Sequence, residues 1–242
     1  MSDVGAIVVF AGPSLPQAGR SSDPLFAWRD PATAGDAFAL AKSRPRAVVL
    51  IDGFFDEKPA IRHKELLTLI ACGTVVIGGA SMGALRAAEL NAFGMIGAGQ
   101  IYDAYARGYL VGDDEVAVSH GPAEWDWRPL TEPLVNVRAT ILRAVRTFVI
   151  DAPTGRLVLS AAKGLFYKSR TWTTILASTK CAGAPIGALE AWLPGGRVDL
   201  KRLDALVCLE TARRFASLEP VARAFPPRTL YSDFLAAQVA GL

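Results

Sequence analysis

A serine between glycines is the residue of this chain whose type and setting point most directly to chemistry. Residues 79–83 read Gly-Ala-Ser-Met-Gly and match the G-x-S-x-G pattern, in which a sharp strand-to-helix turn exposes a serine hydroxyl. The N–H groups that open the following helix, beginning near Met82, suit an anion or a developing oxyanion. We therefore predict that Ser81 is a nucleophile or an oxyanion-site hydroxyl. A helix N-cap is the structural alternative.

The chain has only two histidines, and each is a candidate for moving a proton near Ser81. His63 opens the helix after the second predicted strand, which should place it near the carboxyl edge of the sheet, so we rank it first as general base. Lys64 and Glu65 follow it directly and join it as candidate catalytic residues, although consecutive helical residues point in different directions. His120, which we also assign to substrate binding, is the alternative base. A solvated surface position is the structural alternative for His63, Lys64 and Glu65, and a locally bonded residue at the end of a strand is the alternative for His120.

Other charged residues and the cysteines carry weaker signals. Arg86 and Glu89 stand three residues apart on the helix after the serine, which favours an ion pair, while the functional alternative has Arg86 bind a terminal carboxyl group. The acidic residues at 113–115 are more typical of a solvated turn than of a cation site. In the functional alternative, Asp113 or Asp114 orients His120. Three scattered cysteines without a C-x-x-C pair predict a reduced compartment, no disulfide framework and no zinc site. We expect no metal and no cofactor.

Alternating apolar runs and helix-forming stretches provide the framework for these residues. Strands are predicted in the runs at 6–10, 46–51 and 74–78. Helices are predicted at 35–42, at 61–71 and directly after the serine turn. The alternation predicts an α/β fold, a parallel sheet with helices on both faces in a flavodoxin- or Rossmann-like order, followed by a C-terminal helical lobe.

Parallel strands end at one edge of a sheet, and ligands bind there. Three polar turns should converge at that edge, and we assign residues of these turns and of the helix that follows to substrate binding: Gly12, Ser14, Asp52, Gly53, Met82 and Arg86. A strand order of 2-1-3 would place the Gly12 turn in the middle, but the sequence does not decide the order.

The rest of the chain reads as loops, a short strand pair and helices. We predict a long loop at 15–33, a glycine-rich turn at 94–99, a strand at 116–120, and an edge strand that carries Trp125 and Trp127 on one face. Helices are predicted at 101–109, 133–149, 158–165, 170–178, 199–217 and 231–239. We divide the chain into an α/β core domain at 1–150 and a helical C-terminal lobe at 151–242.

Composition and charge exclude several classes of protein. A chain of 242 residues with 51% hydrophobic content can bury a sizeable core. Its net charge of +3 is spread along the sequence, without the block of like charges that nucleic acid or a membrane surface attracts. No apolar run approaches the roughly 20 residues that span a bilayer. We expect a cytoplasmic protein that binds neither nucleic acid nor membranes.

Several motifs in a fixed order resemble those of the TfuA-like family. They are Gly-Pro-Ser-Leu at 12–15, Ile-Asp-Gly-Phe-Phe at 51–55, His-Lys-Glu at 63–65, the segment from Gly79 to Leu90, and Asp-Asp-Glu-Val-Ala-Val at 113–118 with His120. The resemblance spans roughly residues 6 to 145. The segment from Ser81 to Glu89, joined to His-Lys-Glu upstream, is its most specific part.

The resemblance implies a partner protein in peptide-backbone thioamidation, a post-translational modification. TfuA-like proteins accompany YcaO enzymes, which activate a peptide amide with ATP so that sulfur replaces oxygen. The implied role is hydrolysis of a thiocarboxylated, ThiS-like sulfur-carrier protein, which releases sulfide for the YcaO enzyme and its peptide substrate. The alternative is a non-catalytic adaptor that recruits or activates YcaO. A nucleotide-binding module is a weaker alternative, because no P-loop or Rossmann fingerprint follows the first strand.

Overall fold

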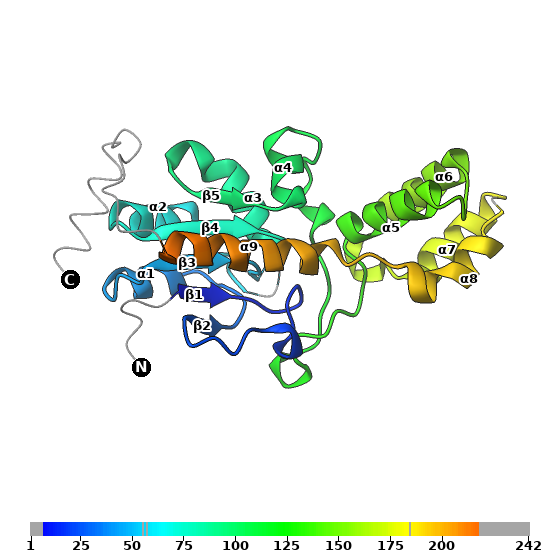
Figure 1. Cartoon of the computed structure of the whole chain (residues 1–242). Coiled ribbons are helices and arrows are strands. Elements are labelled where there is room, and N and C mark those ends of the chain that lie inside the picture. Colours follow the sequence, from blue (N-terminus) through cyan, green and yellow to red (C-terminus); the bar gives the residue numbers. More distant parts are fainter. Residues whose placement is uncertain (1–6, 55, 57, 184, 218–242) are drawn as a thin grey trace. The chain divides into compact units, whose positions relative to one another are not determined.

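The computed structural model describes residues 7–54, 56, 58–183 and 185–217 (Figure 1). Contacts between Cα atoms divide the chain into two compact units. The sheet unit comprises the chain up to Leu110 together with the chain from Arg202 on, and the helical unit comprises Val111–Lys201. This division differs from the boundary expected at residue 150 in two ways. Residues 111–150 belong to the helical unit, and the last described helix packs on the sheet.

Five parallel strands form the sheet, in the order β2-β1-β3-β4-β5. The strands are β1 (Ile7–Phe10), β2 (Phe26–Arg29), β3 (Ala47–Leu50), β4 (Val75–Gly79) and β5 (Ile96–Ala98). Every residue of β1 and β3 is buried, as expected for strands that are covered on both faces. The order is that of flavodoxin-like sheets, so the predicted α/β fold is confirmed.

Two strands are missing from the sequence prediction. β2 lies within the predicted long loop at 15–33, and β5 lies within the predicted glycine-rich turn at 94–99. Both are edge strands of only four and three residues. An edge strand pairs on one side only and is not fully covered, so it lacks the continuous apolar run by which a buried strand is recognised.

The order of the strands also decides which turn is central. Among the three strands predicted from the sequence, β3 lies between β1 and β4. The turn at Asp52 and Gly53, which follows β3, therefore lies between the other two polar turns, and the Gly12 turn is not the central one.

Helices cover both faces of the sheet. They are α1 (Asp36–Ala41), α2 (His63–Ala71), α3 (Met82–Leu90), α4 (Gln100–Ala106) and α9 (Leu200–Ser217). Buried residues of α1, α2 and α3 share one apolar cluster with the sheet, and those of α9 share the cluster on the opposite face. Figure 1 shows α9, in orange, lying along the strands. Asp204 of α9 caps α4 by accepting from the N–H groups of Gln100 and Ile101.

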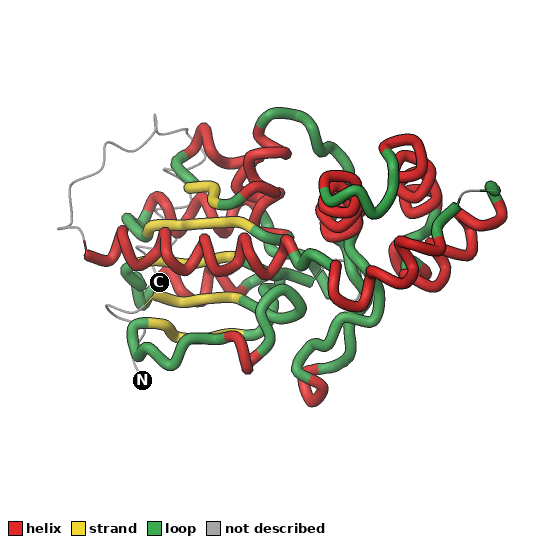
Figure 2. Tube along the Cα trace, turned by 45° about the vertical axis from the view of Figure 1, so that its right-hand side comes forward, coloured by secondary structure: helices red, strands yellow, loops and turns green. Residues whose placement is uncertain are grey.

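The helical unit contains four helices among its described residues (Figure 2). They are α5 (Leu134–Arg146), α6 (Ala152–Gly164), α7 (Trp172–Cys181) and α8 (Gly187–Gly196), and they share one apolar core. α8 is absent from the sequence prediction, and the helix predicted at 231–239 lies outside the described residues. In the described part of the chain, no helix is long and apolar enough to span a bilayer.

The strands predicted at 116–120 and around Trp125 are wrong. Residues 113–115 and 123–125 form single 3₁₀ turns, and only an isolated bridge joins His120 to Pro129. Trp127 has a positive φ of 55°, which breaks the strand alternation that would place both tryptophans on one face. Trp125 is exposed whereas Trp127 is buried.

Candidate functional site

The polar turns meet at the carboxyl edge of the sheet, where the carboxylate of Asp52 ties two of them together. Asp52 Oδ2 accepts hydrogen bonds from the backbone N–H groups of Gly12 and Ser14, both at 2.9 Å. Asp52 Oδ1 accepts a hydrogen bond from the Ser14 hydroxyl at 2.6 Å. Both side chains are buried, and the carboxylate therefore holds the Gly12 turn against the end of the central strand.

The turn that carries Ser81 is a tight reversal after β4. The N–H of Ser81 donates to the carbonyl of Gly79 at 2.7 Å, and Ala80 between them has a φ of +64°. A hydrogen bond across a single residue of positive φ marks the rare, strained form of γ-turn. Ala80 is completely buried, so the surrounding packing holds it in this conformation.

The glycines of the motif are required by close approach of the backbone. A Cβ atom on Gly83 would overlap the carbonyl oxygen of Leu50, and one on Gly78 would overlap the carbonyl oxygen of Gly83. The N–H of Gly83 also donates to the carbonyl of Ile51 at 3.2 Å. The first turn of α3 therefore lies directly on the ends of β3 and β4, which fixes the position of Ser81.

Ser81 is buried as a residue, at 7% exposure, and its hydroxyl has no hydrogen-bond partner among the residues that the structure describes. Ser81 occupies the N-cap position of α3, but its side chain makes no capping hydrogen bond. The N-cap alternative therefore does not explain the residue. The neighbouring Met82 is buried against Gly53, so an apolar side chain and the adjacent central turn flank the hydroxyl.

His63 is bound to the helix that follows the serine, not to the serine. Its Nε2 lies 2.7 Å from Glu89 Oε2, and Arg86 donates to the same oxygen at 2.8 Å. Burial favours the neutral carboxyl, but Arg86 and then His63 outweigh it and lower the pKa of Glu89. Glu89 follows Ser81 by roughly two helical turns. No hydrogen bond joins His63 to Ser81.

The residues beside His63 differ sharply in their surroundings. Glu65 is buried, and its Oε2 accepts from the N–H of Gly35 at 2.7 Å. Its Oε1 accepts from the N–H of Arg62 at 3.4 Å, as in a capping box of α2. Lys64 is exposed at the surface. The carboxylate of Glu65 thus holds the starts of α1 and α2 together.

His120 belongs to the helical unit, where Nδ1 lies 2.9 Å from the carbonyl of Gly121 and the ring meets Trp127 edge to face. The acidic turn that precedes it is paired with arginines. Glu115 makes a two-fold hydrogen bond with Arg138, at 2.8 and 2.7 Å, and Asp114 pairs with Arg170 at 2.9 Å. No group of His, Cys, Asp or Glu residues suited to a metal ion occurs in the described ranges.

Residues 52–171 match the family model described as TfuA-like protein. Over this segment, just under half of its length, the chain is similar to the TfuA-like family. The matched segment contains Asp52, His63, Ser81 and His120, so it spans residues of both units. No curated protein matches the chain. The family supports an accessory role in thioamidation and is associated with YcaO enzymes.

The cysteines of the chain do not offer an alternative nucleophile at the serine turn. Cys208 of α9 is buried, and a Cβ atom on Gly79 would overlap its sulfur. Burial, reinforced by the charge of Asp204, raises the pKa of the Cys208 thiol far above its ordinary value. A neutral buried thiol is a packing residue and not a nucleophile.

Two supporting residues escaped the sequence prediction. Arg20 donates to the carbonyls of Leu15 and Ala11, at 3.2 and 3.0 Å, and so holds the loop around the Gly12 turn. The spacing along the sequence indicates Glu89 only as a partner of Arg86, although its carboxylate also binds His63. A single arginine in a polar loop carries no periodic signal, and a contact between two helices cannot be derived from the spacing within one.

Proposed function

We propose that this protein is an accessory enzyme of peptide-backbone thioamidation. It hydrolyses a thiocarboxylated, ThiS-like sulfur-carrier protein and releases sulfide for a YcaO-type enzyme. The observation that carries the proposal is the Ser81 hydroxyl, which lacks a partner among the described residues and lies where three polar turns meet. Ligands of parallel sheets bind at this edge, so a serine hydroxyl that no described residue engages there supports a role in binding or chemistry.

In the proposed reaction, the carrier tail enters at the carboxyl edge of the sheet. Ser81 Oγ attacks the thiocarboxylate carbon, a C–O bond forms, and the C–S bond then breaks to release hydrosulfide. Water next hydrolyses the acyl-serine ester. The sum is thiocarboxylate plus water giving carboxylate, hydrosulfide and one proton. The Met82 N–H, in the first turn of α3 where no intrahelical acceptor exists, would stabilise the oxyanion.

The other predicted site residues take supporting roles in this proposal. His63 accepts the proton through a bound water, with Glu89 fixing the ring through Nε2. Arg86 uses Nη1 for Glu89 and Nε for the carbonyl of Ile61, at 2.8 and 3.3 Å, and its remaining N–H groups bind the tail. Lys64, exposed beside His63, contacts the carrier surface.

The buried carboxylates of Asp52 and Glu65 support the loops around the proposed site and do not touch the substrate. His120 binds the carrier outside the serine turn in this proposal. The wall of the proposed crevice is formed by backbone atoms of Gly12, Ser14 and Gly53. The Ser14 hydroxyl does not contribute, because it donates its hydrogen bond to Asp52.

Sulfide release from a purified thiocarboxylated carrier tests the proposal. The wild type, Ser81→Ala and His63→Ala are compared, with Ser178→Ala on the exposed face of α7 as a matched serine control. We expect Ser81→Ala to lower the rate at least about 100-fold, as loss of a nucleophile does. We expect a smaller loss for His63→Ala and none for Ser178→Ala. Unchanged rates in both site variants would refute the assignment of these residues.

A non-catalytic adaptor for YcaO is the second candidate, and one observation favours it: no base is hydrogen-bonded to Ser81. Thioamidation by YcaO with free sulfide in excess separates the two functions. An adaptor is still needed under those conditions, whereas a sulfide-releasing enzyme is bypassed. Dependence on the protein at saturating sulfide, together with no sulfide release from the carrier, would establish the adaptor in place of the hydrolase.

A further inference from the structure

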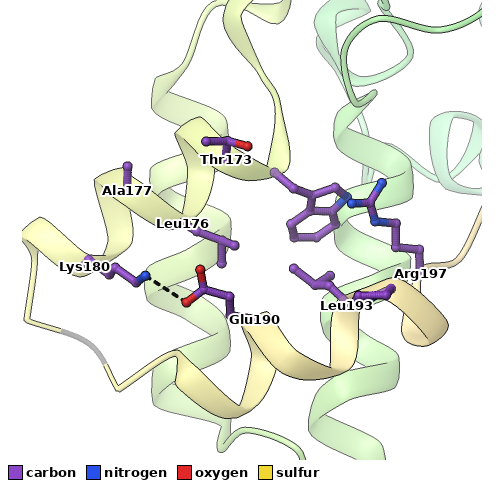
Figure 3. A pocket seen from close by; sticks show the side chains of 9 residues that line it. Thr173, Leu176, Ala177, Lys180, Glu190, Leu193 and Arg197 are labelled. Atoms are coloured by element: carbon purple, nitrogen blue, oxygen red, sulfur yellow. Dashed lines mark hydrogen bonds and ion pairs between the residues drawn. The ribbon is translucent and has the colours of Figure 1, made fainter.

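The helical unit has a cavity between α7 and α8 that the proposed function does not use. Its volume is about 330 Å³, at the small end of the range for ligand pockets. Figure 3 shows Leu176 and Leu193 between the Lys180–Glu190 pair on one side and Arg197 on the other. The cavity therefore has an apolar middle and charged ends.

Two side chains at the Arg197 end of the cavity carry hydrogen-bond donors that the described residues do not fully satisfy. Trp172 lines the cavity, and its indole Nε1 is buried with no hydrogen-bond partner among the described residues. The guanidinium carbon of Arg197 lies 5.9 Å from the centre of the Trp172 ring. Arg197 makes one long hydrogen bond, from Nη1 to Glu132 at 3.4 Å, and its remaining N–H groups bind no other described residue.

The acidic groups near the cavity do not supply the missing acceptor. At the far end, Glu190 is paired with Lys180 at 2.8 Å. Near Arg197, Glu132 is largely buried, and burial together with the charge of Asp199 outweighs Arg197 and raises its pKa. Glu132 meets Arg197 only at the limit of hydrogen-bond distance, so two kinds of donor, one guanidinium and one indole, remain for a ligand.

We propose that this cavity binds a small apolar carboxylic acid, either free or as the C-terminal residue of a peptide. The carboxylate accepts from Arg197 and from the Trp172 indole, and the apolar body lies between Leu176 and Leu193. The indole nitrogen is shielded in this structure. Arg197 lies over the ring and is about half exposed, so it turns toward the carboxylate as the ligand enters. A guanidinium is the side chain best suited to a two-fold contact with a carboxylate.

Titration of the ¹⁵N-labelled full chain with N-acetyl-L-leucine tests the proposal. The readout is the indole N–H resonance of Trp172, one of five tryptophans, assigned with Trp172→Phe. We expect this resonance to move downfield and to saturate. N-acetyl-L-leucinamide, which lacks the carboxylate, should bind at least about tenfold more weakly, the effect of one charge-assisted hydrogen bond. The tripeptide Gly-Gly-Leu separates the two sources: tighter binding than the free acid indicates a peptide C-terminus.

Matched variants locate the binding. Ala177→Trp fills the cavity and should abolish binding, whereas Ser178→Trp, the next exposed residue on α7 but outside the lining, should leave it within twofold. Arg197→Gln should weaken binding about tenfold, and Glu132→Gln, which replaces the competing carboxylate with a neutral amide, should strengthen it. No shift with the acid, equal affinity for acid and amide, or unchanged binding in Ala177→Trp would overturn the proposal.

Discussion

Two adjacent strands end in buried polar residues that are used in opposite ways. Asp52 follows β3, is 3% exposed and accepts three hydrogen bonds from the Gly12 turn. Ser81 follows β4, is 7% exposed, and its hydroxyl bonds to none of the described residues. Burial alone therefore does not separate a structural residue from a functional candidate. The state of its hydrogen bonds does.

The difference follows from what surrounds each side chain. A buried carboxylate without partners would be costly, so Asp52 is stable only because backbone N–H groups and a hydroxyl converge on it. An unpaired hydroxyl costs less than an unpaired carboxylate. The strained Ala80 together with the close approach of Gly83 holds Ser81 in place through the backbone. The Ser81 turn is thus fixed by packing, which leaves its side chain available.

The largest effect should come from the glycine that lets α3 approach the sheet. Gly83→Ala places a methyl group against the carbonyl of Leu50, a backbone atom that cannot move aside, and should lower the free energy of unfolding by about 3 kcal/mol or more. Gly164→Ala, at the end of α6 with no atom near the added methyl, is the matched control and should be neutral or slightly stabilising. Urea unfolding measures both. A tolerated Gly83→Ala would mean that packing does not fix the turn.

A smaller loss should follow from the carboxylate of the central turn. Asp52→Asn keeps the size of the side chain but sets an amide N–H₂ against groups that also donate, so it should cost about 2 kcal/mol. Asp30→Asn, at an exposed aspartate directly after β2, is a control that should change stability little. Urea unfolding of the two variants provides the comparison, and equal stabilities would show that Asp52 does not anchor the Gly12 turn.

The pair formed by His63 and Glu89 should contribute less. Glu89→Gln removes a carboxylate whose pKa is lowered by Arg86 and His63 against the opposing effect of burial. Because the pKa is lower in the folded state, the stabilisation is present above the unfolded value of about 4.3 and is lost as the pH falls through the folded value. With 43% of the Glu89 side chain exposed, the cost near pH 7 should be only about 0.5 kcal/mol. Thermal unfolding should show it shrink below pH 4, and a cost that grows in acid would contradict the pairing.

The elements that could be predicted from the sequence are those marked by continuous apolar runs and short motifs. The strands β1, β3 and β4 and the meeting of their turns follow from continuous apolar runs and from the geometry of parallel sheets. β2 and β5 were missed because edge strands carry a weaker signal. The contact between His63 and Glu89 depends on how α2 packs beside α3, which no local pattern encodes. The sequence could place Ser81 on a turn but could not tell whether its hydroxyl was bonded.

The smallest change in stability is the sharpest test of the comparison, because two buried serines undergo the same substitution. Ser14→Ala removes a hydroxyl that donates to Asp52 at 2.6 Å and should cost about 2 kcal/mol, since it leaves a buried carboxylate one donor short. Ser81→Ala removes a hydroxyl that no described residue uses and should change the free energy of unfolding by less than about 0.5 kcal/mol. Urea unfolding of both variants decides the matter. If Ser81→Ala lowered the free energy of unfolding as much as Ser14→Ala, the Ser81 hydroxyl would have to stabilise the turn itself. The main structural argument for a chemical role of Ser81 would then fail.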